Sequence, residues 1–300
     1  MCYAIIDLGS NTIRLCVYDY AGGVINTIVN QKETGGLAGY VTSGILSQDG
    51  IEKACEILNA HIALAKKLVD KSNIHILATA SLRNIDNREE AVEAIYRKTE
   101  MLPEVLTGEE EALLDFIGAS YHINYQRGLL IDIGGASTEL VLFDNHEPVA
   151  LASMPIGCLT LYRKYVENIF PSQEEEKQIK REVLRFLQET NLQKDCPIVI
   201  GVGGSVKAVN KLARVLFPET GDILEADIVK KLHKRFKNPD QKLLDAVYKT
   251  IPERTLTIVP GLILLKQAIK FFGSQAIHVN EYGLREGYLL DRILGVKKEC

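Results

Sequence analysis

The stretch Tyr3-Ala4-Ile5-Ile6-Asp7-Leu8-Gly9-Ser10-Asn11 decides the fold, because Leu129-Leu130-Ile131-Asp132-Ile133-Gly134-Gly135-Ala136-Ser137 repeats its pattern. In each stretch an apolar run leads to an aspartate and a turn rich in glycine and serine, and a second apolar run follows. Short apolar runs bounded by such turns are typical of buried strands in a hairpin. The repeat therefore predicts two related halves, each presenting one polar loop to a ligand.

The length and composition fit a globular protein of two domains with about 150 residues each. Of the 300 residues, 46% are hydrophobic and 25% are charged, so the chain can bury a sizeable core. The net charge of -4 argues against a broad nucleic-acid surface, although it leaves room for a local basic groove.

The six cysteines have no CxxC pair or zinc-like spacing, so we expect buried, reduced thiols in a cytoplasmic protein. We expect no leader peptide and no membrane span, because the longest apolar run near the end, 255–265, falls short of the roughly 20 residues required.

Strands and helices alternate along the chain, which predicts an α/β protein with mixed sheets. In the first half we expect a third strand at 23–30, a strand at 74–78 with a polar turn at 79–83, and helices at 50–71, 89–99 and 107–121. In the second half we expect a helix headed by the capping box Ser172-Gln173-Glu174-Glu175, a strand at 197–202 and a helix at 206–216. The remainder is expected to be mostly helical, with one strand at 276–279 and a final helix at 284–294.

Glycine-rich loops follow three of the apolar strands, at 9–11, 134–137 and 203–205. Glycine and serine allow the tight turns that bring several backbone N–H groups onto one phosphate. A single loop of this kind is equally typical of an ordinary hairpin. Three of them together favour phosphate binding.

Several acidic residues near these loops have both a structural and a chemical interpretation. Asp7 and Asp132 either cap their own turns or hold a divalent cation, to which Glu139 across the hairpin can contribute. Glu139 taken alone is also compatible with a solvent-facing strand position. Glu110 completes a capping box with Thr107, whereas Glu111 lies beyond the cap and can orient or deprotonate a water molecule.

Arg83 follows the turn at 79–81 and Arg254 follows Pro252-Glu253. Either arginine can be a surface charge, but phosphoryl transfer needs guanidinium groups to balance charge on the transferred group. Lys207, just after the third loop, is a weaker candidate for the same role.

Taken in chain order, these motifs resemble the exopolyphosphatase / guanosine pentaphosphate phosphatase (Ppx/GppA) family. The matching stretches are Ile6-Asp7-Leu8-Gly9-Ser10-Asn11-Thr12-Ile13-Arg14, Thr79-Ala80-Ser81-Leu82-Arg83 with Asn87, Gly108-Glu109-Glu110-Glu111-Ala112, Asp132-Ile133-Gly134-Gly135-Ala136-Ser137-Thr138-Glu139-Leu140, Met154-Pro155-Ile156-Gly157, Gly203-Gly204-Ser205 and Gly283-Leu284-Arg285-Glu286-Gly287. The resemblance spans nearly the whole chain.

The resemblance implies an α/β fold of two actin-like (ribonuclease H-like) domains of the ASKHA ATPase superfamily, with mixed sheets flanked by helices and an active-site cleft between the domains. We place domain I at 1–120 and domain II at 121–300, with the C-terminal helix, about 284–300, as a candidate to pack back on domain I.

The resemblance also implies a site. Glu111, Arg83 and Asp132 are the predicted catalytic residues, with Glu111 activating the attacking water. Asp132 and Glu139 are the predicted ligands of Mg²⁺ (or Mn²⁺). The predicted phosphate-binding residues are Asp7, Gly9, Ser10, Asn11, Arg14, Gly134, Gly135, Ser137, Gly203, Gly204, Ser205 and Arg254.

The function implied is that of an exopolyphosphatase, which hydrolyses terminal phosphoanhydride bonds of inorganic polyphosphate. The alternatives are a guanosine pentaphosphate (pppGpp) 5'-phosphohydrolase and a non-catalytic sensor that binds nucleotide or polyphosphate. We expect no nucleic-acid or membrane partner, and a homodimer is one expected assembly.

Two residues depart from the family pattern. Ala136 replaces the last glycine of the usual triplet, and Leu256 stands where an aspartate usually follows Arg254. We also expect a short form of the family, without the C-terminal helical extension of longer members.

Overall fold

The computed structural model describes residues 1–121, 123, 125–193 and 195–296. The chain divides into two compact units, a first unit of Met1–Glu111 with Arg292–Cys300 and a second unit of Ala112–Asp291. The expected domain boundary at residue 120 stays a prediction. Two residues of the segment just after it, 122 and 124, and the last four of the chain, including Cys300, lie outside the described residues.

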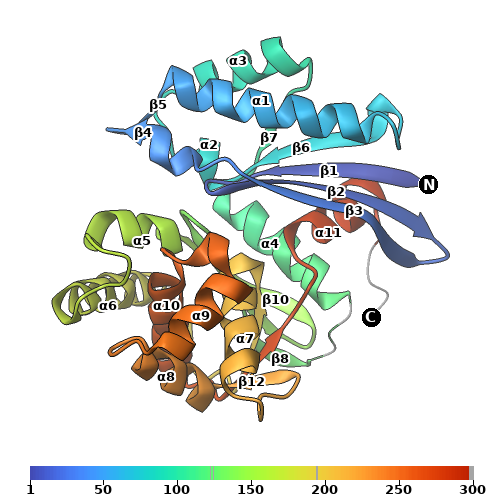
Figure 1. Ribbon diagram of the computed structural model, residues 1–300. Coiled ribbons are helices and arrows are strands. Elements are labelled where there is room, and N and C mark those ends of the chain that lie inside the picture. Colours follow the sequence, from blue (N-terminus) through green and yellow to red (C-terminus); the bar gives the residue numbers. More distant parts are fainter. Residues whose placement is uncertain (122, 124, 194, 297–300) are drawn as a thin grey trace. The chain divides into compact units, whose positions relative to one another are not determined.

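The first unit is built on a five-stranded sheet in the order β3-β2-β1-β6-β7 (Figure 1). Its elements are β1 (Cys2–Leu8), β2 (Thr12–Ala21), β3 (Val24–Thr34), β4 (Val41–Thr42), β5 (Ile45–Leu46), α1 (Gln48–Ala65), β6 (Ile74–Ala78), α2 (Ala80–Arg83), α3 (Arg88–Thr99) and β7 (Glu104–Val105). Strands β1, β2 and β3 form an antiparallel meander, and β6 and β7 continue the sheet in parallel from β1.

The core of the first unit lies between this sheet and helix α1. Ala4, Ile6 and Leu8 alternate along β1 and pack with Ile51 and Leu58 of α1, as the period of two in a strand requires. Helix α1 ends at residue 65 rather than the expected 71. The N–H of Lys67 donates to the carbonyl of Leu64, three residues back (3.1 Å), which tightens the chain out of the α-helical pattern. The expected polar turn at 79–83 forms the short helix α2.

The second unit contains a six-stranded sheet in the order β10-β9-β8-β11-β13-β12. Its elements are α4 (Gly108–Ser120, which starts in the first unit), β8 (Arg127–Ile133), β9 (Thr138–Asp144), β10 (Glu147–Met154), α5 (Cys158–Tyr165), α6 (Gln173–Glu189), β11 (Ile198–Val202), α7 (Gly203–Leu216), β12 (Ile223–Glu225), α8 (Ala226–Arg235), α9 (Gln241–Thr250), α10 (Ile258–Phe272), β13 (Ala276–Val279) and α11 (Leu284–Tyr288).

Five strands of this sheet, β10-β9-β8-β11-β13, repeat the order and directions of the first unit. The prediction that the two halves share a topology is therefore confirmed. The prediction of a single strand after residue 216 was wrong, since β12 pairs antiparallel with β13. It has only three residues, too few to show a period in the sequence.

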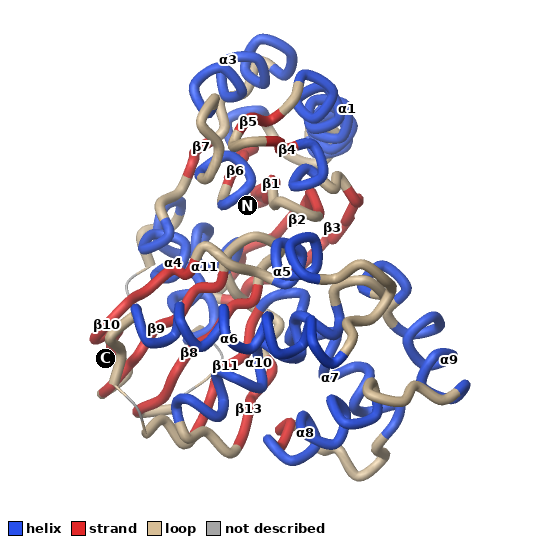
Figure 2. The backbone as a smooth tube through the Cα atoms, turned by 90° about the vertical axis from the view of Figure 1, so that its left-hand side faces the viewer, coloured by secondary structure: helices blue, strands red, loops and turns tan. Residues whose placement is uncertain are grey.

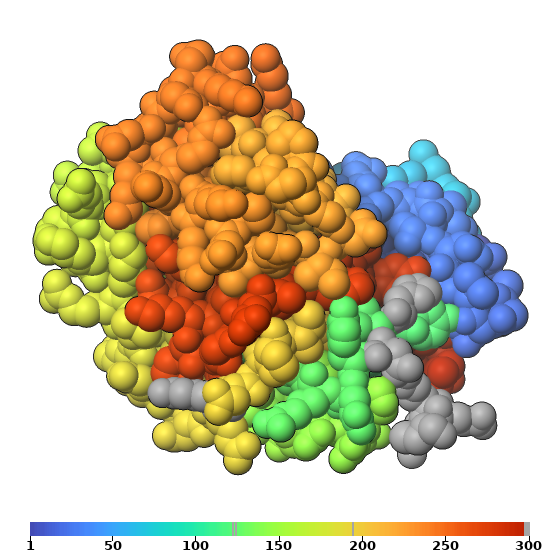
Figure 3. Space-filling model, turned by 90° about the horizontal axis from the view of Figure 1, so that it is seen from below, coloured from blue at the N-terminus to red at the C-terminus, as the bar shows by residue number. Residues whose placement is uncertain are grey.

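The sheet of the second unit is covered on both faces (Figure 2). Leu129 and Ile131 of β8 face a large core with α7 and α10, while Leu130 packs with Phe116 of α4 on the other face. Asp132 has the same parity as Leu130 and so belongs to the α4 face. Figure 3 shows one surface of this unit, where the orange residues of α8 and α9 gather.

The cysteines are mostly buried, as expected. Among the described residues, Cys16, Cys55, Cys158 and Cys196 are buried and none forms a disulfide. Burial raises the pKa of the Cys55 and Cys196 thiols, which keeps them protonated. No helix in the described ranges is long and apolar enough to cross a membrane.

Candidate active site

The turn after β1 offers backbone donors. The N–H of Gly9 donates to the carbonyl of Thr12 (3.1 Å), and the carbonyls of Ser10 and Asn11 accept N–H groups from 35–38 (2.9–3.1 Å). Within the described residues, no acceptor lies within hydrogen-bond distance of the N–H groups of Ser10 and Asn11. With the carbonyls held, these two N–H groups can bind an anion.

The turn after β8 has the same design. The N–H of Gly134 donates to the carbonyl of Ser137 (3.0 Å), and the carbonyls of Gly134 and Gly135 accept N–H groups from 158–160 (2.9–3.1 Å) at the start of α5. In the described part of the chain, the N–H groups of Gly135 and Ala136 have no acceptor. The predicted phosphate loops thus share one hydrogen-bond pattern. Ala136 does not adopt a positive φ, so its methyl group imposes no left-handed strain.

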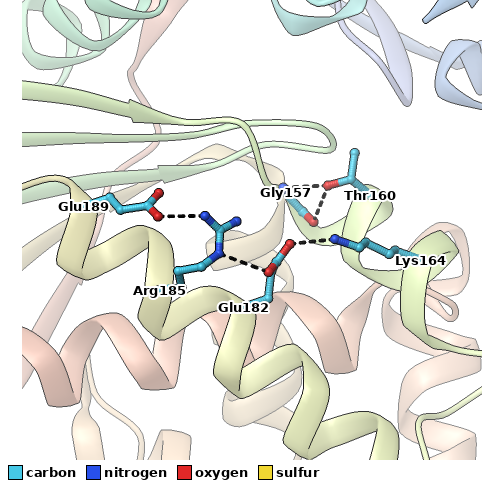
Figure 4. A network of polar contacts seen from close by, with 6 residues as sticks. All are labelled: Gly157, Thr160, Lys164, Glu182, Arg185 and Glu189. Atoms are coloured by element: carbon cyan, nitrogen blue, oxygen red, sulfur yellow. Dashed lines mark hydrogen bonds and ion pairs between the residues drawn. The ribbon is translucent and has the colours of Figure 1, made fainter. Parts of the chain in front are cut away.

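Helix α5 is held in place so that it can support this second turn (Figure 4). The N–H of Gly157 donates to Thr160 Oγ1 (2.9 Å), and Lys164 pairs with Glu182 of α6 (2.7 Å). A Cβ on Gly157 would lie 2.5 Å from the carbonyl oxygen of Gly134, so only glycine permits this approach. The motif Met154-Pro155-Ile156-Gly157 does not by itself indicate a role for this glycine, because its contact with the turn is not local in sequence.

The two aspartates have different partners across their hairpins. Asp7 lies opposite Arg14 in the register of β1 and β2, whereas Asp132 lies opposite Glu139 in β8 and β9. Directly opposed residues of an antiparallel pair have Cβ atoms about 5 Å apart, and like charges there are destabilising. The first hairpin therefore carries a balanced pair, and the second an acidic pair that a cation would stabilise.

The acidic pair is held by its neighbours. Glu139 is fully buried and its Oε1 accepts a hydrogen bond from Ser153 of β10 (2.9 Å). Asp132 Oδ1 lies against the α-carbon of Gly203, whose φ of +79° is in the left-handed region that glycine tolerates. A Cβ on Gly203 would overlap Oδ1 and lie 2.9 Å from Cγ.

These residues fit Mg²⁺ chemistry. Among the described residues, no group of three or more histidine, cysteine, aspartate or glutamate side chains could hold a metal ion by itself. Mg²⁺ is usually bound by one or two carboxylates together with water and substrate phosphates. The pair Asp132 and Glu139 matches that donor set, and a substrate would have to complete it.

A third set of groups that could bind an anion lies at the N-terminus of α7. Arg254 is 8% exposed and packs against Gly204. A Cβ on Gly204 would lie 3.0 Å from Cζ of Arg254. Its side chain donates to Cys158 Sγ (3.8 Å), which also accepts from Ser205 Oγ (3.3 Å). No carboxylate in the described residues pairs with Arg254, and Leu256 is 45% exposed. A buried guanidinium beside a helix N-terminus favours an anionic ligand.

In the first unit, Arg83 and Glu111 form a nearly buried ion pair. Arg83 Nη1 donates to Glu111 Oε2 (2.6 Å) and to the carbonyl of Leu106 (3.1 Å). Glu111 is 7% exposed. The capping box expected at Thr107 and Glu110 is present (2.9 and 3.1 Å), so Glu110 is engaged in the helix start while Glu111 meets the arginine.

The structure thus groups the predicted residues in two sets. The first unit contains Asp7, Gly9, Ser10, Asn11, Arg14, Arg83 and Glu111, and the second contains Asp132, Gly134, Gly135, Ser137, Glu139, Gly203, Gly204, Ser205 and Arg254. Lys207 forms an ion pair with Glu281 (3.1 Å), which accounts for its charge without a phosphate ligand. Asn87 makes two hydrogen bonds to the backbone of Leu46 (both 3.0 Å), so its role is structural.

The sequence profile of the Ppx/GppA phosphatase family matches residues 16–295. The chain belongs to this family. A guanosine-5'-triphosphate,3'-diphosphate pyrophosphatase of Vibrio campbellii is 30% identical to this family member over 97% of the chain and 59% of that protein. A protein of the same description from Vibrio parahaemolyticus is 29% identical, again over 59% of its length. The chain therefore spans about three fifths of the length of these curated relatives.

Solved structures of similar length support the family and the fold. The Aquifex aeolicus member of the Ppx/GppA family is 25% identical, with a TM-score of 0.80 over 98% of each chain. An exopolyphosphatase from Cytophaga hutchinsonii is 22% identical, with a TM-score of 0.87 over 99% of each chain, and shows the shared fold. The predicted actin-like α/β fold with mixed sheets flanked by helices is confirmed.

Proposed function

We propose that this chain is an exopolyphosphatase that removes the terminal phosphate of inorganic polyphosphate as orthophosphate. The observation that carries the hydrolytic chemistry of the proposal is the nearly buried pair of Arg83 and Glu111, a carboxylate and a guanidinium 2.6 Å apart at the start of α4. A hydrolase of phosphoanhydrides needs one group to direct water and another to offset phosphoryl charge.

In this proposal Glu111 orients the attacking water and takes its proton. The water oxygen bonds to the terminal phosphorus, the bridging P–O bond breaks, and the remaining chain leaves with the electron pair. Arg83 and Arg254 offset charge on the transferred phosphoryl group, and the N–H groups of the turns at 9–11 and 134–137 orient its oxygens. Positioning and charge neutralisation supply most of the rate in such reactions.

We assign a divalent cation, Mg²⁺ or Mn²⁺, to Asp132 and Glu139. When bound, the cation would neutralise phosphate oxygens and fix their geometry. Ser153 orients Glu139 through its hydrogen bond, and Gly203 leaves room for Asp132.

A second candidate substrate is guanosine pentaphosphate. The observation in its favour is that the curated relatives from Vibrio carry that activity in their descriptions. The chemistry of Glu111 and Arg83 serves both substrates. Phosphate release measured on polyphosphates of several lengths, pyrophosphate and guanosine pentaphosphate, with Mg²⁺ or Mn²⁺, would rank them.

The decisive variant is Glu111→Gln, with Glu109→Gln as its control. Glu109 is exposed and two residues away on the same helix, so its substitution makes the same chemical change outside the ion pair. We expect Glu111→Gln to fold normally and to release phosphate about 10²- to 10⁴-fold more slowly, while Glu109→Gln keeps normal turnover. Equal turnover in the two variants would overturn the assignment. Tight polyphosphate binding without any phosphate release by the unmodified protein would favour the sensor instead.

A further inference from the structure

The charge of the chain is distributed very unevenly. Residues 226–272 contain ten lysines and arginines against four aspartates and glutamates, a net charge of +6. Since the whole chain carries -4, the rest of it carries -10. This basic stretch covers α8, α9 and α10 of the second unit, and Figure 3 shows its orange residues gathered on one surface.

Within the stretch, Lys237 and Lys270 lie near Lys266, as does Lys180 of α6, and we call these four residues the lysine cluster. Helix α10 carries Lys266 and Lys270 one turn apart and packs against both α6 and α8. Lys180 and Lys266 are partly buried, whereas Lys237 and Lys270 are exposed. The cluster therefore combines two anchored amines with two that reach solvent.

Glu176 is the carboxylate that contacts the cluster. Glu176 Oε2 accepts from Lys180 (2.7 Å) and lies 3.2 Å from His233 Nε2, and His233 Nδ1 lies 2.9 Å from Lys266 Nζ. In the described residues, no carboxylate lies within ion-pair distance of Lys237 or Lys270. Glu176 is thus reached by two of the four lysines, by Lys180 directly and by Lys266 through His233.

The lysines of the cluster repel one another. Burial lowers the pKa of Lys266, and repulsion from Lys180, Lys237 and Lys270 lowers it further, while Glu176 acts in the opposite direction. Like charges held together destabilise a protein unless a ligand compensates them. A multivalent anion bound at the cluster would offset the repulsion between its lysines.

We propose that the lysine cluster is a second anion-binding site, which holds the body of a polyphosphate chain at a distance from its terminal phosphate. This inference rests on the proposed function. Helix α10 starts four residues after Arg254, and Lys266 and Lys270 lie about 12 and 18 Å along it from its first residue. A chain of only a few phosphates held at Arg254 would not extend to both lysines.

The chemistry of the cluster favours polyphosphate over nucleic acid. Lysine ammonium groups act as point charges for phosphate and need no planar partner. Single-stranded nucleic acid is held by stacking on aromatic side chains as well as by charge. Phe236, which follows α8, is only 4% exposed, and Phe271, next to Lys270, is partly buried and packs edge-on against Phe272, so neither ring is a free platform.

The test uses the double variant Lys237→Ala/Lys270→Ala, which changes only exposed side chains. Its control is Lys230→Ala/Lys249→Ala, which removes the same charge from the same stretch at lysines that already pair with aspartates (2.8 and 3.8 Å). We expect the test variant to raise KM for long-chain polyphosphate roughly 10- to 30-fold. Its kcat, and its KM for tripolyphosphate, should equal those of the control.

Binding measured without metal separates this inference from the proposed function. Calorimetric titration with long-chain polyphosphate, tripolyphosphate, orthophosphate and a single-stranded oligonucleotide of matched charge should show weakened binding of the test variant for the long chain alone. If the protein binds the long chain through these lysines but releases no phosphate, only the proposed function fails. Equal long-chain binding by test and control variants overturns the inference, as does equal loss of oligonucleotide binding or of orthophosphate binding.

Discussion

Substitution of Gly203 by alanine tests how the acidic pair is positioned. The residue has φ +79°, and a left-handed φ costs an alanine about 1–2 kcal/mol. Its new Cβ would also overlap Oδ1 of Asp132 and lie 2.9 Å from Cγ, and such overpacking typically adds about 1–3 kcal/mol. We therefore expect Gly203→Ala to lower the free energy of unfolding by about 2–5 kcal/mol.

The control is Gly273→Ala, in the same unit. Gly273 has a similar φ of +71°, but the nearest atom to its Cβ position is at an ordinary 3.7 Å. This variant should lose only the backbone contribution, about 1–2 kcal/mol. The difference between the variants in urea unfolding then isolates the displacement of Asp132.

The same pair of variants reports on the metal. When Asp132 is displaced, the Mg²⁺ concentration needed for half-maximal phosphate release should rise about tenfold or more in Gly203→Ala, as for loss of a ligand-orienting contact. Gly273→Ala should keep the Mg²⁺ dependence of the unmodified protein. The reasoning is refuted if both variants lose equal stability and retain the same Mg²⁺ dependence.

Three further predictions concern stability. Asn87→Ala should cost about 1–3 kcal/mol in urea unfolding, because it removes two hydrogen bonds that hold the backbone of β5. Although burial favours its neutral form, hydrogen bonds from His233 and Lys180 lower the pKa of Glu176 to about 2, against an ordinary 4.5. Its contribution, on the order of 3 kcal/mol, should be present above pH 4.5 and disappear as the pH falls towards 2, and Glu176→Gln should remove that pH dependence of unfolding. Gly287→Ala should destabilise the second unit by several kcal/mol in thermal unfolding (about 3 or more), because its Cβ would overlap a backbone carbonyl of α4 and lie 2.6 Å from the carbonyl carbon.

Each of these has its own control. Asn59→Ala removes a longer, exposed hydrogen bond (3.3 Å) and should change stability little, so a similar loss in both asparagine variants would contradict the first. Glu174→Gln, on the same helix but exposed, should leave the acid dependence intact. The Cβ of Gly221→Ala would meet nothing within 4 Å, so this control should keep its stability. If Gly287→Ala is as stable as Gly221→Ala, the close approach of α4 and α11 is contradicted.

Much of the fold was accessible from the sequence because its signals are local. The repeated apolar run, aspartate and turn specified β1, β2, β8 and β9, and the capping boxes at Thr107 and Ser172 marked two helix starts correctly. The strand expected at 276–279 matches β13. Each of these elements carries its own period or cap, which needs no knowledge of its neighbours.

The elements that escaped prediction depend on partners distant in sequence. Strand β10 begins with Glu147-Pro148 and has only exposed or partly buried residues until Met154, as an edge strand can, so its apolar signal is weak. The role of Gly157 as a support for the turn at 134–136 required knowing that α5 meets that turn. The Cys158 thiol beside Arg254 could not be inferred, because 96 residues separate them.

The carbonyl groups of both phosphate turns are already occupied by neighbouring backbone N–H groups, from 35–38 in one case and from 158–160 in the other. The backbone of each turn is thus already ordered when the chain folds, and a ligand does not have to order it. An anion that docks on either turn, on Ser10 and Asn11 or on Gly135 and Ala136, incurs little ordering entropy, so more of its intrinsic interaction energy is retained as affinity. Two rigid turns of this kind should therefore bind phosphate with a largely enthalpic signature, and quickly, since no loop must close first.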